Sequence, residues 1–376
     1  MIPRLITSAI RQRLTDSDKI IVLYGPRQVG KTTLVRELIR DLPYKSLSVN
    51  ADELLYQTVL SSRDLAQMKL LVEGYDLLFI DEAQRIPDVG INLKILHDAL
   101  PSLKIITTGS SSFELANRTK EALTGRTWTY ELFPISLGEL QQQQNAFALQ
   151  QRLDELLRFG SYPDTLQLPN AADKARYLRE LSSAYLYKDI LEMASIRYAG
   201  KLRKLLQLLA FQVGSEVSPN KLANALGMSK DTVNTYIDLL EKAFVIFRLS
   251  AFSRNLRKEI SKMDKIYFYD LGIRNVLIDN FQPLDLRADT GALWENFLIV
   301  ERRKRNAYSD QFASTYFWRT YTGAELDYVE EQDGQLAGYE FKLSSKTAKE
   351  PASWAATYPG ASFQVINRTN FLPFVL

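Results

Sequence analysis

The chain has 376 residues, which is long for one ordinary domain, and its 46% hydrophobic and 24% charged residues are typical of a soluble globular protein. It has no cysteine and a single histidine, which excludes disulfides, thiol nucleophiles and metal clusters built from cysteine or histidine. No hydrophobic run approaches the ~20 residues of a membrane-spanning helix, and the N-terminus lacks the pattern of an export signal. We therefore expect a cytoplasmic protein of two or three domains with no membrane partner. The net charge of +3 is compatible with nucleic acid without requiring it.

A short β-branched run at residues 19–24 leads directly into a glycine-containing loop, and a helix is expected to follow. The loop reads Gly-Pro-Arg-Gln-Val-Gly-Lys-Thr-Thr, the pattern of a phosphate-binding P-loop. Its glycines permit the turn that directs backbone N–H groups at phosphate, Lys31 reaches the β- and γ-phosphates, and Thr32 offers a hydroxyl to Mg²⁺. The sequence thus predicts ATP and Mg²⁺ as cofactors. The residues expected to contact the nucleotide are Gly25, Pro26, Arg27, Gln28, Val29, Gly30, Lys31, Thr32 and Thr33.

A second strand, at residues 76–80, ends in Asp81 and Glu82. Asp81 is placed to hold Mg²⁺ through water, and Glu82 to polarise the water that attacks the γ-phosphate. A third strand, at 104–108, ends in a polar run in which Thr108 and Ser110 are candidates for contact with the γ-phosphate; a simple turn is the alternative. Strands at 45–49 and 128–133 alternate with helical stretches, which predicts a parallel α/β sheet.

These motifs resemble those of the AAA+ ATPases, and specifically of a group found in bacteria and archaea. The resemblance rests on the P-loop, on Asp-Glu-Ala-Gln at 81–84, on Thr-Gly-Ser-Ser at 108–111, and on Leu-Thr-Gly-Arg at 123–126 followed by Phe-Pro-Ile-Ser at 133–136. It implies that Ser110 occupies the sensor position and that Arg126 or Arg118 acts as an arginine finger toward a neighbouring subunit. It also implies a homo-oligomeric ring, with a hexamer as one candidate. The catalytic set is then Glu82, Lys31, Asp81, Ser110 and Arg126.

The middle of the chain is rich in helical patterns. By the same resemblance, an AAA+ core at 1–140 is followed by a helical lid at 141–200. A helix at 219–226, a glycine turn, a second helix capped by Ser229 and a strand at 244–249 then predict a winged-helix domain at 201–252. The outward residues of the second helix are mixed in sign, so DNA contact and a purely structural role both stay open. These residues are Lys230, Asp231, Asn234, Thr235 and Asp238.

The C-terminal part carries two charged segments, at 323–329 and 338–343, on either side of an Asp-Gly pair that is a strong hairpin signal. In the register set by this turn, Asp327 lies opposite Glu340, and Lys342 lies opposite Glu325 on the same face. Two opposed carboxylates destabilise a hairpin unless a cation lies between them, which favours a divalent-metal site beside Lys342. The alternative is a charged face in which Lys342 pairs with Glu325.

Asp327 followed by Glu340-Phe341-Lys342 resembles the core of the PD-(D/E)xK nucleases, and a preceding helix supplies Glu295, the early glutamate that many members carry. The resemblance implies a restriction-endonuclease-like α/β domain at 253–376. Glu295, Asp327 and Glu340 would hold Mg²⁺, and Lys342 would position or activate water. The proline that names the motif is absent, because Leu326 precedes Asp327. The same fold also serves as a binding module without cleavage.

The whole chain is thus expected to be an α/β protein with a P-loop NTPase (AAA+) core, a helical lid, a winged-helix domain and a restriction-endonuclease-like domain. Its main predicted function is an ATPase that acts on DNA, branched or broken DNA included, with basic clusters at 254–258 and 302–305 contacting phosphate. The first alternative is an ATP-gated switch that binds a protein partner and carries an inert nuclease-like module. The second keeps DNA and adds Mg²⁺-dependent nuclease activity.

Overall fold

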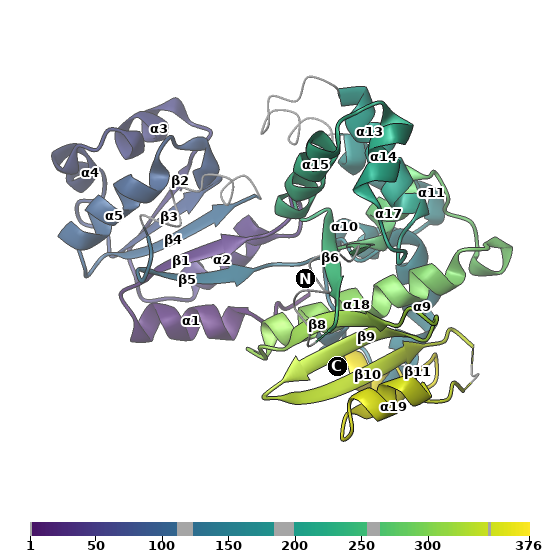
Figure 1. Cartoon of the computed structure of the whole chain (residues 1–376). Helices are drawn as coiled ribbons and strands as arrows, with labels where there is room; N and C mark the ends of the chain where they lie inside the picture. Colours follow the sequence, from purple (N-terminus) through teal and green to yellow (C-terminus); the bar gives the residue numbers. More distant parts are fainter. Residues whose placement is uncertain (1, 111–122, 184–198, 254–263, 345–346) are drawn as a thin grey trace. The chain divides into compact units, whose positions relative to one another are not determined.

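The computed structural model of the chain describes residues 2–110, 123–183, 199–253, 264–344 and 347–376 (Figure 1). They fall into two compact units. Unit 1 contains Met1–Pro134 and Lys242–Phe244, and unit 2 contains Ile135–Glu241 and Val245–Leu376. Within the described ranges, no helix is long and hydrophobic enough to cross a membrane.

Unit 1 is a parallel β-sheet with helices on both faces (Figure 1). Its strands are β1 (Ile20–Tyr24), β2 (Ser46–Asn50), β3 (Leu77–Asp81), β4 (Lys104–Gly109) and β5 (Thr127–Glu131). Its helices are α1 (Thr7–Asp16), α2 (Lys31–Arg40), α3 (Leu54–Ser61), α4 (Leu65–Leu71), the 3-10 turn η1 (Ala83–Arg85) and α5 (Val89–Ala99). Every pairing between these strands is parallel, which confirms the predicted sheet.

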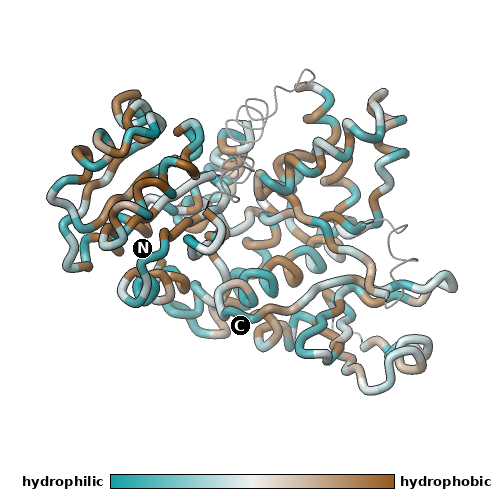
Figure 2. Tube along the Cα trace, turned by 60° about the vertical axis from the view of Figure 1, so that its left-hand side comes forward, coloured by the Kyte–Doolittle hydropathy of each residue, from teal (hydrophilic) through white to brown (hydrophobic). Residues whose placement is uncertain are grey.

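The strand order β2-β3-β4-β1-β5 brings the predicted phosphate-binding residues to one edge of this sheet. β1 is buried along its whole length, as its uninterrupted hydrophobic run predicts. β4 lies between β1 and β3, with Tyr24 level with Gly109 and Thr107 level with Ile80. The carboxyl ends of the three strands therefore meet, and ligands of open α/β sheets bind at such an edge. Figure 2 shows hydrophobic stretches running through the inside of the units, with hydrophilic stretches on the outer helices.

Unit 2 combines a helical layer with a six-stranded mixed sheet of order β11-β10-β9-β8-β6-β7. Its strands are β6 (Ile246–Ala251), β7 (Lys265–Phe268), β8 (Ser314–Arg319), β9 (Glu325–Gln332), β10 (Gln335–Phe341) and β11 (Ser362–Ile366). Its helices up to β6 are α8 (Leu137–Gln141), α9 (Ala146–Phe159), α10 (Pro163–Gln167), α11 (Ala171–Leu181), α13 (Ala199–Phe211), α14 (Pro219–Leu226) and α15 (Lys230–Lys242). The later ones are α17 (Leu271–Leu277), the turn η3 (Leu284–Leu286), α18 (Thr290–Tyr308), α19 (Ala352–Thr357) and α20 (Leu372–Val375).

The predicted C-terminal hairpin is confirmed. β9 and β10 pair antiparallel from Gln335↔Gln332 to Tyr339↔Tyr328, the register that the Asp333-Gly334 turn predicts. Both turn residues have positive φ, 51° and 78°, as a tight hairpin turn of this type requires. One face of this hairpin packs into a hydrophobic cluster that includes Trp318, Leu326 and Trp354.

The predicted helix–turn–helix segment is also present. α14 ends at Gly227, whose φ of 58° is left-handed, and Ser229 caps α15 by accepting the Thr232 N–H at 3.1 Å. The following strand, β6, pairs antiparallel with β7 and parallel with β8, so it belongs to the same sheet as the C-terminal hairpin. The division of unit 2 at residues 200 and 252 stays a prediction.

Candidate functional site

The P-loop lies between the end of β1 and the start of α2, and its glycines occupy backbone conformations that need them. Gly30 has a φ of 96° and forms the N-cap of α2. At Gly25, with a φ of 148°, an added Cβ would lie 2.1 Å from the carbonyl oxygen of Leu132. The first N–H groups of α2 follow Gly30 directly, so the helix presents them and its dipole to an anion.

Lys31 is buried and turned onto its own loop. Its Nζ donates to the carbonyl oxygens of Gly25 and Pro26, both at 2.8 Å. Burial lowers the pKa of Lys31 to about 8, although Glu82 and Asp81 act in the opposite direction. A phosphate entering the loop would thus replace two weak carbonyl acceptors by charged oxygens.

Asp81 and Thr32 meet at the carboxyl edge of the sheet. The hydroxyl of Thr32 lies 3.0 Å and 2.9 Å from the two carboxylate oxygens of Asp81, and Thr108 donates its hydroxyl to the same carboxylate. A hydroxyl and a carboxylate side by side are the oxygen ligands that Mg²⁺ takes with nucleotide phosphates, so these residues fit the ion.

Glu82 follows in a strained conformation, with a φ of 54° that non-glycine residues rarely adopt. Its N–H points to the hydroxyl of Thr108 at 3.4 Å, and its carboxylate accepts from the amide of Gln84. The turn η1 thus directs the predicted water-polarising carboxylate and holds it through Gln84. Ser110, one residue beyond β4, is 4% exposed.

Of the two arginine-finger candidates, the structure describes only Arg126. Arg126 forms a two-pronged ion pair with Asp98 of α5, with N–O distances of 2.8 Å and 3.1 Å. It precedes β5 and its carbonyl accepts the N–H of Ile20, so it lies at the amino end of the strands, opposite the P-loop of its own chain. Its role toward a neighbouring subunit stays a prediction, and Arg118 lies outside the described residues.

The C-terminal charged residues gather around β9 and β10, but their pairing differs from the predicted one. Phe341 donates its N–H to Asp327 at 2.7 Å, and Lys342 pairs with Glu340 of its own strand at 2.5 Å. The predicted alternative, Lys342 with Glu325, is wrong. Glu325 pairs instead with Lys265 of β7 at 2.6 Å, and with Arg319 at 3.8 Å.

Lys265 is the internal cation of this cluster. It is buried and also lies 3.3 Å from Glu295 of α18, which accepts the hydroxyl of Tyr267 at 2.5 Å. Burial and the negative charges of Glu295 and Glu340 raise the pKa of Asp327 to about 7. Across the described ranges, no group of three or more histidine, aspartate or glutamate side chains is arranged to hold a metal ion. The carboxylates are held instead by donors from the protein, and the metal assignment of Glu295, Asp327 and Glu340 stays a prediction.

Two residues of the basic run at 302–305, Arg302 and Lys304, are engaged by carboxylates of the fold and are not available to phosphate, which corrects the expectation from sequence for these two. Arg302 is paired with Glu330 at 2.8 Å and 2.5 Å, and Lys304, 1% exposed, forms a buried pair with Glu301 at 2.7 Å. Arg303 stacks over Phe247. Arg302 and Lys304 thus lie on packed sides of α18, where their charges organise the interior. The cluster at 254–258 lies outside the described residues.

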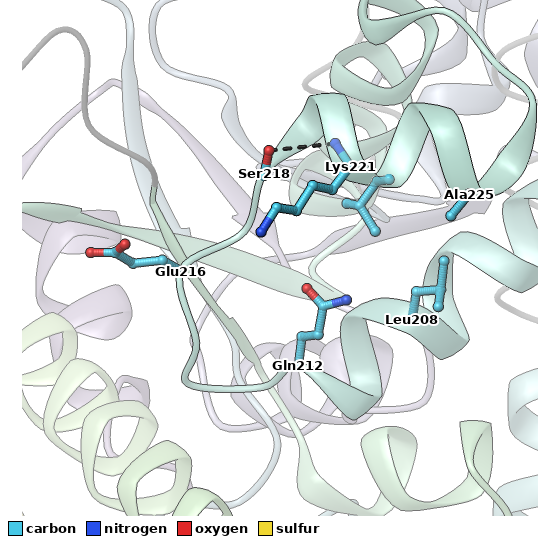
Figure 3. Close-up of a pocket in the computed structure, with 7 residues that line it drawn as sticks. Leu208, Gln212, Glu216, Ser218, Lys221 and Ala225 are labelled. Atoms are coloured by element: carbon cyan, nitrogen blue, oxygen red, sulfur yellow. Dashed lines mark hydrogen bonds between the residues drawn. The ribbon is translucent and has the colours of Figure 1, made fainter.

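The described residues also line two pockets. One, of about 390 Å³, lies between α13 and α14 (Figure 3). The side chains of Gln212 and Lys221 extend into it, while Glu216 points away. The other, of about 540 Å³, is lined by residues around Asp76 and Leu103, which precede β3 and β4. It therefore lies at the amino ends of the strands, away from the P-loop.

Sequence patterns do not single out three of the side chains that build these sites: Arg4, Lys265 and Tyr267. Arg4 donates to the P-loop carbonyl of Val29, 25 positions away, and Tyr267 reaches Glu295 across 28 positions. Such contacts leave no local motif. Gln84 does belong to the quoted motif at 81–84, but its hydrogen bond to Glu82 was not predicted.

Comparison with known proteins gives the class. Residues 17–141 match the family model of the AAA domain, and residues 150–284 and 290–368 match two domains of unknown function, DUF8612 and DUF4143. An uncharacterised protein of Mycobacterium tuberculosis is 28% identical over 350 residues, 92% of this chain and 75% of that protein. One from Methanocaldococcus jannaschii is 28% identical over 311 residues, 77% of this chain and 67% of that protein. Among solved structures, the Walker-type ATPase PABY2304 of Pyrococcus abyssi aligns with a TM-score of 0.52 at 15% identity, over 74% of this chain and 96% of that one.

The parallel sheet, the P-loop and the AAA-domain match together define an AAA-type P-loop ATPase domain. The other two matches name no activity, so the helical lid, the winged-helix domain and the nuclease-like domain stay predictions.

Proposed function

We propose that this chain binds and hydrolyses Mg²⁺·ATP at the P-loop and uses the cycle to act on DNA through the segment from α13 to β7. Lys31 would exchange its loop carbonyls for phosphate oxygens, and Thr32 and Asp81 would hold the nucleotide's Mg²⁺. Glu82 would orient the attacking water and Ser110 would contact the γ-phosphate. An arginine from a neighbouring subunit would complete the site, which is why we also propose a homo-oligomeric ring. Residues 141–200 would act as the lid.

The observation that carries the DNA proposal is the order of elements after the lid. Helix α14, a glycine turn and helix α15 are followed by the antiparallel pair β6–β7, and Glu216 between α13 and α14 bridges to β7. A helix–turn–helix is a layout that places its second helix in the major groove, and here an antiparallel strand pair follows it. Lys221 of α14 and Lys230 of α15 are exposed, although Asp231 and Asp238 share the outward face of α15 with Lys230.

ATP turnover measured with single-stranded, duplex and branched DNA tests this proposal, with Lys31→Ala as the inactive control. We expect stimulation at low salt that decreases as salt rises, because each phosphate contact releases about 0.9 counterion. The double variant Lys221→Ala/Lys230→Ala should lower the salt slope by about two. Arg176→Ala, on the exposed face of α11, is the matched control. Turnover indifferent to every DNA at low salt would overturn the proposal.

A second candidate is an ATP-gated switch for a protein partner. It is favoured by the internal pairing of the C-terminal carboxylates with Lys265, Tyr267 and Lys342. It is also favoured by the burial of Lys304 and by the pairing of Arg302 with Glu330. Both observations describe a module whose charges serve its own fold. In this case a purified partner protein would bind Glu82→Gln loaded with Mg²⁺·ATP, which that variant should not hydrolyse, and would not bind the protein loaded with Mg²⁺·ADP. Added DNA would change neither result.

The nuclease alternative is decided by plasmid nicking in Mg²⁺ or Mn²⁺. Nicking that is lost in Lys342→Ala would establish it, with Lys349→Ala, an exposed lysine, as control. Intact plasmid in the wild-type reaction would exclude it under those conditions.

A further inference from the structure

Arg4 binds the back of the P-loop. Its Nη1 donates to the carbonyl of Val29 at 2.6 Å, and its Nη2 donates to the carbonyl of Phe133 at 2.6 Å. The same Nη1 lies 3.7 Å from where a Cβ of Gly30 would stand. The guanidinium thus touches the loop immediately before the first residue of α2, although it lies outside the motif.

The contact sets the direction of one peptide group. In a trans peptide the C=O of Val29 and the N–H of Gly30 point to opposite sides of the plane. Because Arg4 holds the carbonyl on one side, the N–H of Gly30 is directed to the other. The residues on either side of Val29 also have left-handed backbone conformations, with a φ of 59° at Gln28 and of 96° at Gly30. A hydrogen bond to the Val29 carbonyl therefore helps to hold this part of the loop in its conformation. Successive N–H groups in such a loop form the concave cradle that receives phosphate.

The second hydrogen bond fixes Arg4 itself. Phe133 follows β5, whose pairing with β1 holds it against the sheet, and the N–H of Leu132 donates to Tyr24 at 2.8 Å. The two carbonyls that Arg4 joins therefore belong to the loop and to a rigid strand end. A planar fork of donors spans two carbonyls in this way, which a lysine ammonium on a flexible stem does less well.

We propose that Arg4 is a positioning residue for nucleotide phosphate: it clamps the Val29 carbonyl to the end of β5 and so presents the Gly30 N–H to the ligand. The proposal rests on nucleotide binding at the P-loop and not on any action on DNA. Its positive charge, on the far side of the loop from the ligand, also favours an anion there.

The test compares Arg4→Ala, Arg4→Lys and Arg4→Gln with Arg11→Ala. Arg11 is the matched control because it lies on α1 and pairs at the surface with Asp41 at 3.4 Å. Binding of Mg²⁺·ADP and of inorganic pyrophosphate is measured by calorimetry, and KM and kcat for ATP by turnover. We expect Arg4→Ala to weaken both ligands and to raise KM about tenfold, while kcat at saturation falls less than about threefold. Arg4→Lys should recover part of the loss, and Arg11→Ala should bind as the wild type does.

The outcomes separate the proposals. A wild-type protein that binds no nucleotide defeats the assigned site itself. If the wild type binds and Arg4→Ala, folded by circular dichroism, binds equally well, the positioning role is wrong. A fall in kcat with KM unchanged also overturns it, since Arg4 would then act on the transition state. If Arg4→Ala does not fold, Arg4→Gln and Arg4→Lys decide by the same measurements.

Discussion

At the P-loop, a single lysine carries two opposed demands. Lys31 has to be charged to bind phosphate, yet it is 5% exposed and its neighbours on the loop side are carbonyl groups. The cost of burying the charge appears as the lowered pKa, about 8. A bound phosphate removes that cost, so the protonation of Lys31 and nucleotide binding are coupled.

The coupling predicts proton uptake on binding. A bound phosphate should raise the pKa of Lys31. At pH values between the pKa of the free protein and that of the phosphate-bound protein, the affinity for phosphate should fall by up to about tenfold for each unit of rising pH. At pH 8 a phosphate with a second pKa of about 6 is already ionised. Binding of Mg²⁺·ADP should therefore be accompanied by uptake of about half a proton per protein molecule, at Lys31. Calorimetry in two buffers of different ionisation enthalpy measures this uptake. Identical enthalpies in the two buffers would contradict the prediction.

Asp327 gives a second prediction at this scale. Its pKa is raised from 3.8 to about 7, so the native state prefers the protonated form. The stability that this group contributes is present below its unfolded pKa and is lost as the pH rises through 7. Asp327→Asn keeps an acceptor for the Phe341 N–H and should be more stable than wild type at pH 8, by about 3 kcal/mol, with no gain near pH 4.

Urea unfolding at both pH values measures the effect, with Glu350→Gln, an exposed carboxylate, as the control. A variant less stable than wild type at pH 8 would show that ionised Asp327 is favourable in the native protein.

The positions of the candidate site residues were predictable where they follow from the local order of elements, and their roles stay predictions. Residues 25–33 could be placed between a strand and a helix because β1, the loop and α2 follow one another without interruption. Asp81 and Glu82 could be placed at the carboxyl edge of the sheet because they come at the end of the buried strand β3. Arg4 could not be assigned, since its second partner is 129 positions away. Lys265 was missed for the same reason: it lies beside Glu295 and Glu325 only once the sheet is formed.

At the scale of elements, α18 shows how a charged run can be misread. Four consecutive basic residues at 302–305 suggest a solvated face, but the helix packs on two of its sides. Lys304 donates to Glu301, to the carbonyl of Ile135 and to the hydroxyl of Ser161, while Glu301 accepts the N–H of Leu137 at 2.7 Å. The pair thus holds the start of α8 and the loop after α9 to α18.

Removing one partner of this pair should be costly. Lys304→Met leaves the Glu301 charge buried and should lower the free energy of unfolding by about 3 kcal/mol or more. The double variant Glu301→Gln/Lys304→Met should recover part of that loss, since no unpaired charge is left. Urea unfolding measures whether the free energy of unfolding decreases from wild type to the double variant to Lys304→Met. The control is Lys204→Met, at an exposed lysine of α13, which should stay within ~0.5 kcal/mol of wild type. A double variant no more stable than Lys304→Met would contradict the prediction.

Elements with their own signals were predicted well, and their assembly was not. The Asp333-Gly334 turn is sufficient to set the β9–β10 register, and Gly227 and Ser229 are sufficient to delimit α14 and α15. The parallel pairing of β6 with β8 joins Ser250 to Tyr316 and Ala251 to Phe317, which no turn or cap encodes. This pairing is what places Lys265 of the neighbouring β7 in the same sheet as Glu325.

At the scale of the whole molecule, the two units carry distinct spectroscopic reporters. Of the four tryptophans, Trp128 lies in unit 1, and Trp294, Trp318 and Trp354 lie in unit 2. Trp128 is partly exposed beneath Arg13, 4.0 Å from its ring, whereas the other three are buried. Fluorescence can therefore follow each unit separately.

We expect Mg²⁺·ADP to stabilise unit 1 selectively. At 100 times its Kd, a ligand that binds only the native state adds about 2.7 kcal/mol. Thermal unfolding of Trp128→Phe reports unit 2, and its difference from wild type reports unit 1. The nucleotide should raise the unit 1 transition in wild type and leave that of Lys31→Ala in place. A single transition that moves equally in both signals would show that the units unfold together.

The clamp formed by Arg4 also limits how far the P-loop and the end of β5 can move independently of each other. Phe133 is tied to Arg4 within unit 1, and within unit 2 Ile135 donates to the carbonyl of Ser161 at 2.9 Å and accepts from Lys304 at 3.2 Å. Only Pro134 lies between these anchors, and its ring restricts one of its two backbone torsions. Because the Arg4 guanidinium joins the Val29 carbonyl to the Phe133 carbonyl, a displacement that the nucleotide imposes on the P-loop would pull on the end of β5 within unit 1.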